Sequence, residues 1–304
     1  WFFFPSGLAM LLFIGLPIIS SFFQSLHIEP EQILMEVEKC DPFGCKTETK
    51  VDIEATTKLQ EEQPLGRFNG LGTYGDRNHL AFDEIKEAWS NSSSMAEFTD
   101  ILLNLPFYKA LLFTLTFCFA VTPPVVVLGF IVALSINTIT KSLKGPTIFG
   151  VILPMIVTPL IGSLVLFWMI DAKGILGATI QYLFDDPNLS LKSSSQLTWI
   201  TLIIYGIWHN TPFAFVVFYA ALQTVPQDPI EAAIIDGATR YERVRHIVIP
   251  HLYPVATFII LICLMDNFRV LEPIIGFAAE GVAQSLSWMI YNDLRSENKM
   301  LFGS

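Results

Sequence analysis

The sequence predicts an all-α membrane protein that crosses the bilayer several times. Hydrophobic residues make up 52% of the chain and charged residues only 15%. Several uncharged runs are longer than the core of a soluble domain requires, and a spanning helix needs about 20 apolar residues. A soluble globular domain is therefore excluded.

Five stretches are long enough to span a bilayer. They are residues 2–26, 110–137, 146–170, 197–222 and 254–277. A sixth span is expected to start near Met300. The chain opens on Trp1 and stops at Ser304, so we expect both ends to be truncated. The first run is too long for a signal peptide and lacks a small-residue cleavage site, which favours an anchor.

A polar segment, residues 29–106, separates the first span (1–28) from the remaining spans (107–304). It holds 16 of the 28 acidic residues but 7 of the 18 basic ones, which leaves −9 of the formal net charge of −10. We expect a small folded external domain or a cap over a pathway. Its acidic face is either simply solvated or a contact for a soluble substrate-delivery protein.

Two of the four cysteines, Cys40 and Cys45, lie in this polar segment at C-x4-C spacing. We predict a disulfide between them, since no histidine or third cysteine lies nearby to complete a metal site. Cys118 and Cys263 fall in spans and are expected to be buried apolar residues. No metal site is predicted.

Orientation follows from the basic residues and from alternation of the spans. Lys141 and Lys144 lie in a short link without acids, and the loop of residues 223–253 carries three arginines, so both connections should face the cytoplasm. Residues 29–106, 171–196 and 278–299 then lie outside.

The loop of residues 223–253 is expected to form two short helices that make a compact knob. Asp228 before Pro229, with Glu231 three positions on, predicts a helix start, and Gly237 supplies the left-handed residue that closes it. Thr239 with Glu242 repeats the capping-box spacing. Pro250 should end the second helix.

Within this loop, the positions of Glu231, Ala232, Ala233, Gly237, Ile247, Ile249 and Pro250 resemble the coupling loop of permease subunits in bacterial binding-protein-dependent ABC importers. Ile249 replaces the usual Leu, and Val244 replaces a common aromatic residue. The resemblance begins near Tyr108 and includes Leu153-Pro154, Trp168 before Gly174, Trp208, and residues 268–272. These look like the sugar-permease branch, the maltose-type or type I importers, although Gly177 stands where that branch often has Asn.

The resemblance implies a type I importer permease fold in a bacterial inner membrane and a set of partners. These are a second homologous permease, two ATPase subunits that bind ATP and Mg, and an external solute-binding protein. The ATPase-coupling residues are then Glu231, Ala232, Ala233, Asp236, Gly237, Ile247 and Pro250. No cofactor is expected on this chain itself, and no nucleic acid partner.

Polar residues inside spans are costly and mark a candidate pathway. The candidates are Tyr205, Trp208, Asn210, Tyr219, Asp266 and Asn267. Aromatic faces beside amides suit a sugar ring. The alternatives are that Arg269 neutralises Asp266 or Glu272 three positions away on one helix, and that the aromatic residues belt the membrane interface.

No catalytic residues are predicted, because the chain lacks a phosphate-binding loop, a zinc-protease motif and a nucleophile elbow. We therefore expect a transporter subunit that does not hydrolyse ATP alone. A carbohydrate or polyol is the expected solute, with amino acids, phosphate esters and polyamines left open. An ion-coupled secondary transporter using Asp266 and Glu272, or a membrane enzyme or sensor that works through residues 29–106, are the alternatives.

Overall fold

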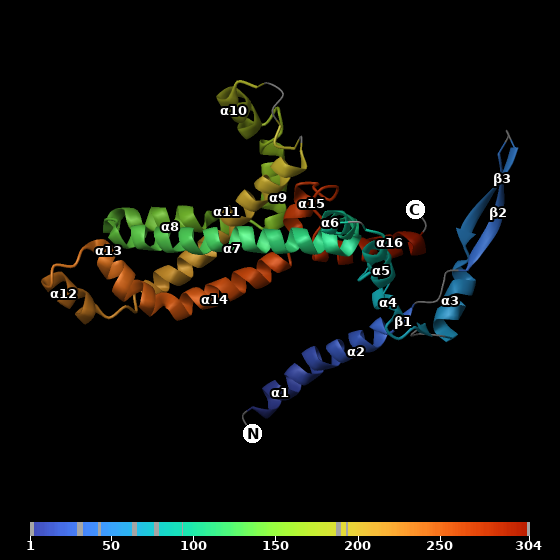
Figure 1. Ribbon diagram of the computed structural model, residues 1–304, viewed down its shortest axis with the longest axis horizontal. Helices are drawn as coiled ribbons and strands as arrows, with labels where there is room; N and C mark the ends of the chain where they lie inside the picture. Colours follow the sequence, from blue (N-terminus) through green and yellow to red (C-terminus); the bar gives the residue numbers. More distant parts are fainter. Residues whose placement is uncertain are drawn as a thin grey trace. The chain divides into compact units, whose positions relative to one another are not determined.

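The computed structural model describes residues 3–28, 33–41, 44–62, 66–75, 79–92, 94–186, 190–192 and 194–302. The chain divides into two compact units (Figure 1). The first consists of Trp1–Lys109 with Tyr291–Ser304, and the second of Ala110–Ile290. Most of the described chain is helical, which confirms the predicted helical fold.

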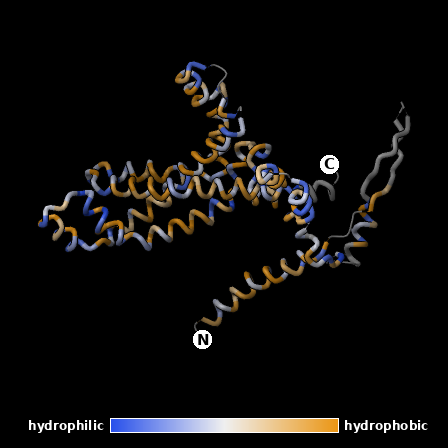
Figure 2. The backbone as a smooth tube through the Cα atoms, in the orientation of Figure 1, coloured by the Kyte–Doolittle hydropathy of each residue, from blue (hydrophilic) through white to orange (hydrophobic). Residues whose placement is uncertain are grey.

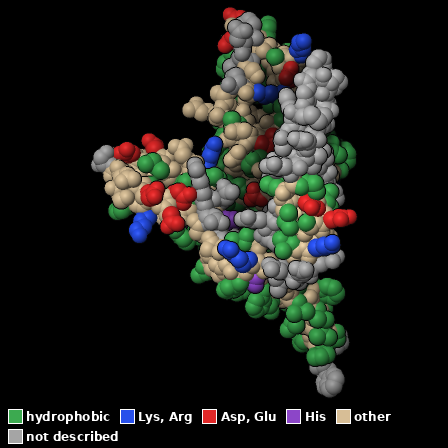
Figure 3. All heavy atoms as spheres, turned by 90° about the vertical axis from the view of Figure 1, so that its right-hand side faces the viewer, with side chains coloured by type: hydrophobic (Ala, Val, Ile, Leu, Met, Phe, Trp, Pro, Cys, Tyr) green, Lys and Arg blue, Asp and Glu red, His purple; other side chains and the backbone are tan. Residues whose placement is uncertain are grey.

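The first unit starts with one continuous apolar helix, Phe4–Ser25, which agrees with the first predicted span. It consists of α1 (Phe4–Met10), a π-helical turn η1 (Leu11–Gly15) and α2 (Leu16–Ser25). Figure 3 shows hydrophobic side chains along the projecting end of this helix, at the bottom of the view. Such a surface needs lipid or protein around it.

The polar segment that follows is folded and contains strands, which the sequence did not predict. Its elements are β1 (His27–Ile28), β2 (Leu34–Asp41), β3 (Gly44–Val51), α3 (Ile53–Glu62), β4 (Arg67–Phe68), α4 (Gly72–Gly75), α5 (Phe82–Asn91) and α6 (Met95–Asn104). β1 pairs with β4 and β2 pairs with β3, both antiparallel. The Tyr74 hydroxyl donates to Ser25 Oγ at 2.6 Å, and the Tyr108 hydroxyl donates to the Leu80 carbonyl at 3.0 Å. These bonds fix the segment to the ends of its flanking helices.

The second unit is a bundle of long helices with shorter ones at its ends. Its elements are α7 (Pro106–Thr138, which begins in the first unit), α8 (Lys141–Ile156), α9 (Pro159–Met169), α10 (Ile175–Phe184), α11 (Ser195–Leu222), α12 (Gln227–Ile235), α13 (Arg240–Arg243), the π-helical turn η2 (Val244–Val248), α14 (Ile249–Phe268), α15 (Glu272–Gly276) and α16 (Leu286–Phe302, which continues into the first unit). The helix α11 packs against α8 and α14, and α15 packs against α9 (Figure 1). Figure 2 shows that α7, α11 and α14 are mainly hydrophobic, whereas polar residues gather around α12 and α13.

In the described chain, four helices are long and apolar enough to cross a membrane, and a bent pair makes a fifth span if it counts as one. The long helices are Phe4–Ser25, Pro106–Thr138, Ser195–Leu222 and Arg240–Phe268. The first three agree with predicted stretches, and Arg240–Phe268 overlaps the predicted stretch 254–277 over residues 254–268. The chain is therefore a multi-pass membrane protein.

The predicted span 146–170 is present as a bent pair of helices, with an angle of 95° between α8 and α9. Val157 and Thr158 between the helices adopt extended backbone angles. Pro159 starts α9, and a proline disfavours helical geometry in the residue before it. The proline thus turns one apolar run into two helices.

Both predictions for the end of the chain also need correction. The fifth span was expected to reach Phe277, but α14 ends at Phe268 and a separate short helix α15 follows. A sixth span was expected to start near Met300; that residue lies within α16, which starts at Leu286 and is not among the described helices apolar enough to span a membrane. Ser285 Oγ accepts a hydrogen bond from the Trp288 backbone N–H at 3.0 Å, and this side-chain cap sets the earlier start.

Two glycines mark places where no side chain fits. A Cβ at Gly276 would overlap the Ser163 side chain, so α15 lies directly on α9. A Cβ at Gly177 would overlap the Asp171 carbonyl oxygen. Gly177 stands where the sugar-permease branch often has Asn. A side chain does not fit at this position here, because the turn before α10 packs against it.

Candidate functional site

The coupling-type loop forms a sharp corner between α12 and α13. Gly237 has φ of +80°, the left-handed conformation that the sequence predicted. The Ala238 N–H donates to the Ala233 carbonyl at 2.8 Å and the Gly237 N–H to the Ile234 carbonyl at 3.1 Å. These two bonds make a Schellman motif, which closes α12.

The predicted capping box at the start of the next helix is present. The Glu242 carboxylate accepts from the Thr239 N–H at 2.7 Å, and Thr239 Oγ1 accepts from the Glu242 N–H at 3.3 Å. Two successive motifs thus fix the corner on both sides of Ala238.

The predicted start of α12 was wrong. The helix begins at Gln227, with Pro226 at the cap position and no side-chain cap, so Asp228 and Glu231 do not form the expected capping arrangement. Pro226 itself explains the earlier start, because its fixed φ of −59° leads directly into the helix. The carboxylates of Asp228 and Glu231 remain exposed.

The sequence predicted that Pro250 ends the second helix, and this prediction is wrong. The helical run Arg240–Phe268 is continuous, with Pro250 in the first turn of α14 directly after η2. A π-helical turn changes the backbone hydrogen-bond pattern just before the proline, whose ring nitrogen donates no bond. The knob is therefore one short helix, a tight corner, and the start of a long helix that continues into the bundle.

The predicted coupling residues are exposed or half-buried on this corner. Glu231, Ala232, Asp236, Gly237 and Pro250 are exposed, and Ala233 and Ile247 are half-buried. Large apolar side chains are exposed beside them: Ile235 is 85% exposed and Tyr241 69%. Together they form a surface, here called the coupling corner (residues 227–250), that suits a protein partner.

A second candidate site is a polar cleft of about 280 Å³ between α11 and the end of α14. It is lined by Phe117, Pro159, Tyr205, Gly206, His209, Asn210, Asp266, Asn267, Arg269, Val270, Glu272 and Pro273. Four of the six predicted pathway residues lie here, namely Tyr205, Asn210, Asp266 and Asn267. Residues more than 50 positions apart in sequence thus meet at one site.

A chain of amide hydrogen bonds crosses the helices beside this cleft. The Asn210 amide donates to Asn267 Oδ1 at 3.1 Å, and the Asn267 amide donates to Thr122 Oγ1 at 3.1 Å. Asn267 is 3% exposed and Thr122 4%. The ladder ties α11, α14 and α7 together where unpaired polar groups would be costly.

The charged residues of the cleft are not paired with one another. Asp266, Arg269 and Glu272 are all exposed, and no ion pair joins them in the described structure. The predicted pairing of Arg269 with a neighbouring acid required one continuous helix. Because α14 ends at Phe268, the three side chains do not follow helical spacing, and that alternative is wrong.

Aromatic groups form one wall of the cleft. The Tyr205 hydroxyl donates to the Pro159 carbonyl at 2.8 Å, and the Tyr205 ring stacks on His209 with centroids 5.7 Å apart. The Nδ1 atom of His209 is buried without a hydrogen-bond partner in the described structure. Tyr205 is 1% exposed and His209 Nδ1 is buried, so this wall is a packed part of the protein behind the cleft.

The structure places the other two predicted pathway residues away from the cleft. Trp208 is 46% exposed and lines a separate apolar hollow with Thr211 and Pro154. Tyr219 lies three turns further along α11 and packs against Phe215 with ring centroids 5.8 Å apart. Its position suits structure rather than contact with a solute in the cleft.

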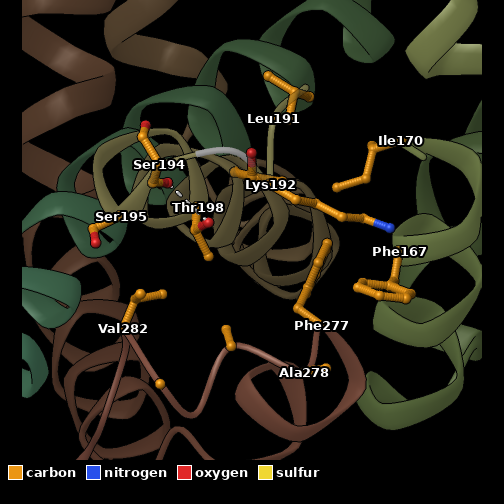
Figure 4. Close-up of a pocket in the computed structure, with 13 residues that line it drawn as sticks. Phe167, Ile170, Leu191, Lys192, Ser194, Ser195, Thr198, Phe277, Ala278 and Val282 are labelled. Carbon is orange, nitrogen blue, oxygen red and sulfur yellow. Dashed lines mark hydrogen bonds between the residues drawn. The ribbon is translucent and has the colours of Figure 1, made fainter. Parts of the chain in front are cut away.

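A third hollow, about 300 Å³, lies near the start of α11 (Figure 4). Lys192 Nζ lies 3.1 Å from Asp171 Oδ2 and 3.3 Å from the centre of the Phe167 ring. The hydrogen bond from Lys192 lowers the pKa of the Asp171 carboxyl below its usual value. Because its charge is already matched, this lysine leaves no free cation in the hollow.

Sequence reasoning missed His209, Arg269 and Glu272 as lining residues of the cleft. Arg269 was predicted only to pair with an acid, and Glu272 to pair with Arg269 or to couple an ion, whereas His209 was considered beside Tyr205 and Asn210 on the fourth span but left out of the candidate residues. Their positions in the sequence could have identified them. His209 lies next to Asn210, and Arg269 and Glu272 lie at the two ends of the break after α14.

The two outer cysteines lie opposite one another in the strand ladder. The register of β2 and β3 pairs Cys40 with Cys45. Their side chains lie outside what the structure describes, so the disulfide stays a prediction. Within the described residues, Cys118 and Cys263 are buried free thiols, and no cluster of metal-ligating side chains occurs.

Comparison with known proteins identifies the class to which this fold and corner belong. The family model described as "Binding-protein-dependent transport system inner membrane component" matches residues 94–271, more than half of the chain. The chain therefore belongs to this family of inner-membrane transport components.

Individual relatives are about a quarter to a third identical to the chain over the residues that align. The trehalose/maltose transport system permease MalF of Thermococcus litoralis is 33% identical over 115 residues, which is 34% of this chain and 39% of the relative. The sn-glycerol-3-phosphate transport system permease UgpA of Yersinia pestis is 27% identical over 55% of this chain and 58% of the relative. The chain thus spans about half the length of these relatives.

Solved structures support the fold. A bacterial ABC transporter that imports the acidic polysaccharide alginate matches 82% of this chain and 88% of its own chain, with a TM-score of 0.52 and 17% identity. A second alginate transporter structure, with a binding protein that carries an alginate pentasaccharide, gives a TM-score of 0.54 and 18% identity. The similarity extends beyond the family match and confirms the importer permease fold.

Proposed function

We propose that the chain is the membrane-spanning permease subunit of an ATP-driven importer for a carbohydrate or polyol. It forms half of the translocation pathway and a second homologous permease forms the other half. Two ATPase subunits, which carry ATP and Mg, bind at the coupling corner, and an external solute-binding protein delivers the solute.

The coupling corner carries this proposal. A Schellman motif and a capping box hold it rigid, while Ile235 and Tyr241 remain largely exposed beside polar side chains. A surface loop of this kind has no need for large exposed apolar groups unless a protein covers them. The relatives named above are permeases of a trehalose/maltose and an sn-glycerol-3-phosphate transport system, which supports a hydroxylated solute.

The continuity of the helix after the corner supports a mechanical role. Because the run Arg240–Phe268 is unbroken, a displacement of the corner moves the far end of α14. That end carries Asp266 and Asn267 and lines the polar cleft. Closure of ATP-bound ATPases would thus change the access of the cleft through a rigid element.

The experiment is purification of the protein from its native membrane with its bound partners, followed by mass spectrometry. We expect recovery of an ATPase and a second permease with the wild-type chain, and loss of the ATPase with Ile235→Asp. The matched control is Leu183→Asp on α10, which is also exposed and lies outside the corner. A wild-type protein recovered without an ATPase would contradict the proposal and favour an ion-coupled transporter.

A further inference from the structure

The charged side chains of the polar cleft carry information about the solute. Asp266, Arg269 and Glu272 come from the end of a membrane helix and the short break after it. Charged groups at such positions are costly in lipid and therefore face a water-filled space or another protein. All three line the same cleft, and no ion pair joins them within the described residues.

The balance of these charges is negative. Two carboxylates face one guanidinium, so the cleft carries one net negative charge when His209 is neutral. The Asn210 and Asn267 amides and the Tyr205 hydroxyl already donate within the protein, and His209 Nδ1 is buried, so the exposed Asp266, Glu272 and Arg269 are the groups left for a solute. Acceptor oxygens and a guanidinium suit hydroxyl groups, which both donate and accept hydrogen bonds.

The aromatic wall adds an apolar surface to this set. The Tyr205 and His209 rings stack nearly parallel, with planes 13° apart, and Phe117 also lines the cleft. Tyr205 and Phe117 are only 1% and 2% exposed, so their rings close the back of the cleft, and the exposed carboxylates are the groups that a solute's hydroxyls can meet. A phosphate or carboxylate on the solute would instead meet two like charges against one guanidinium.

We propose that the polar cleft binds neutral polyhydroxylated solutes and disfavours anionic ones such as sugar phosphates and uronates. The inference rests on the proposed function. It separates neutral from anionic solutes, and the relatives named above include a system for each type. In charge preference the chain is then closer to a trehalose/maltose system than to a glycerol-phosphate system. The specificity residues are Asp266 and Glu272.

The test measures equilibrium binding to the assembled importer in lipid nanodiscs without its binding protein, so that selection by that protein does not enter. The probes are maltose and sn-glycerol 3-phosphate. We expect maltose to bind the wild type with a Kd at least about tenfold lower than that of the phosphate ester. The double variant Asp266→Asn with Glu272→Gln should bind the phosphate ester about tenfold more tightly.

A matched control removes one acid elsewhere. Asp185→Asn removes an exposed carboxylate outside the cleft at a residue with φ of +52°, which Asn tolerates. It should leave the ratio of the two affinities within about twofold of the wild type. Asn and Gln keep their acceptor oxygens, so maltose affinity of the double variant should change by less than about threefold.

Three results would overturn the inference. The first is that the wild type binds the phosphate ester as tightly as maltose or more tightly. The second is that neither probe binds. The third is that the double variant loses the partner permease, which would assign the two acids to subunit contact. ATP-dependent uptake by cells that carry the wild-type importer is measured in parallel. If uptake persists in any of these cases, the solute inference fails and the proposed function stands.

Discussion

At the residue scale, the amide ladder of the polar cleft is the feature most sensitive to single changes. Asn267 donates to Thr122 and accepts from Asn210, so one side chain holds two helices to α14. Hydrogen bonds of this kind contribute about 0.6 kcal/mol each on average in membrane bundles, and up to about 1.7 kcal/mol. Removing the shared residue also leaves two buried polar groups without that partner.

We expect Asn267→Leu to destabilise the second unit by about 1–2 kcal/mol, since it breaks both bonds at once. The measurement is thermal unfolding of the purified protein in detergent. The matched control is Thr257→Val, also on α14, whose hydroxyl bonds only to the Tyr253 carbonyl within the same helix. If both variants unfold at the same temperature, the ladder contributes nothing.

Lys192 gives a prediction about pH at the same scale. Its hydrogen bond lowers the pKa of Asp171, so the folded state is favoured by this pair above the unfolded carboxyl pKa of about 3.9. The contribution is lost as pH falls through the lower folded value. Lys192→Met should therefore lower the unfolding temperature at pH 7, but not at a pH below the folded-state pKa of Asp171, where its carboxyl is protonated. An equal loss at both pH values would contradict the pairing.

At the element scale, close helix contacts depend on glycine. The helix α15 approaches α9 so closely that a Cβ at Gly276 would overlap Ser163, whereas a Cβ at Gly281 would meet nothing within 4 Å. Gly276→Ala should destabilise the protein by about 1–3 kcal/mol through overpacking, and Gly281→Ala should be close to neutral. Thermal unfolding of both variants checks this. Equal unfolding temperatures would mean that α15 does not rest on α9.

The hairpin of β2 and β3 carries the remaining structural prediction. Residues that face each other in an antiparallel ladder are close enough for their side chains to interact, and the register pairs Cys40 with Cys45. We expect that, in denaturant without reductant, two of the four cysteines resist alkylation, and that all four react after reduction. Alkylation of four cysteines before reduction would exclude the disulfide.

Sequence patterns predicted most elements because long apolar runs and capping motifs act locally. The left-handed Gly237, the Thr239–Glu242 box and four long spans could be read directly from such signals. The end of α14 at Phe268 could not, because it depends on packing between elements far apart in sequence, whereas the bend before Pro159 has a local cause in the proline. The strands of the acidic segment were missed because β2 and β3 are highly charged and lack an alternating apolar pattern.

The candidate sites show the same division. Residues of the coupling corner are consecutive, so their spacing alone identified them. Of the pathway residues, Tyr205, Asn210, Asp266 and Asn267 converge, while Trp208 and Tyr219 lie elsewhere. Residues on one helix point in different directions, and composition alone does not tell which face of α11 meets the cleft.

At the scale of the whole molecule, the account requires that the coupling corner transmits ATP-driven motion to the polar cleft. The corner depends on one left-handed residue. A Cβ at Gly237 would meet nothing within 4 Å, so any penalty for a side chain there comes from the backbone conformation alone. Asn tolerates this conformation, whereas a β-branched residue does not.

The most direct measurement is ATP-driven solute uptake by cells that carry Gly237→Val or Gly237→Asn, with the amount of each protein in the membrane determined in parallel. We expect the valine variant to reach the membrane but lose uptake, and the asparagine variant to keep most of it. Normal uptake by the valine variant at equal membrane levels would contradict the role of the corner, and with it the central claim.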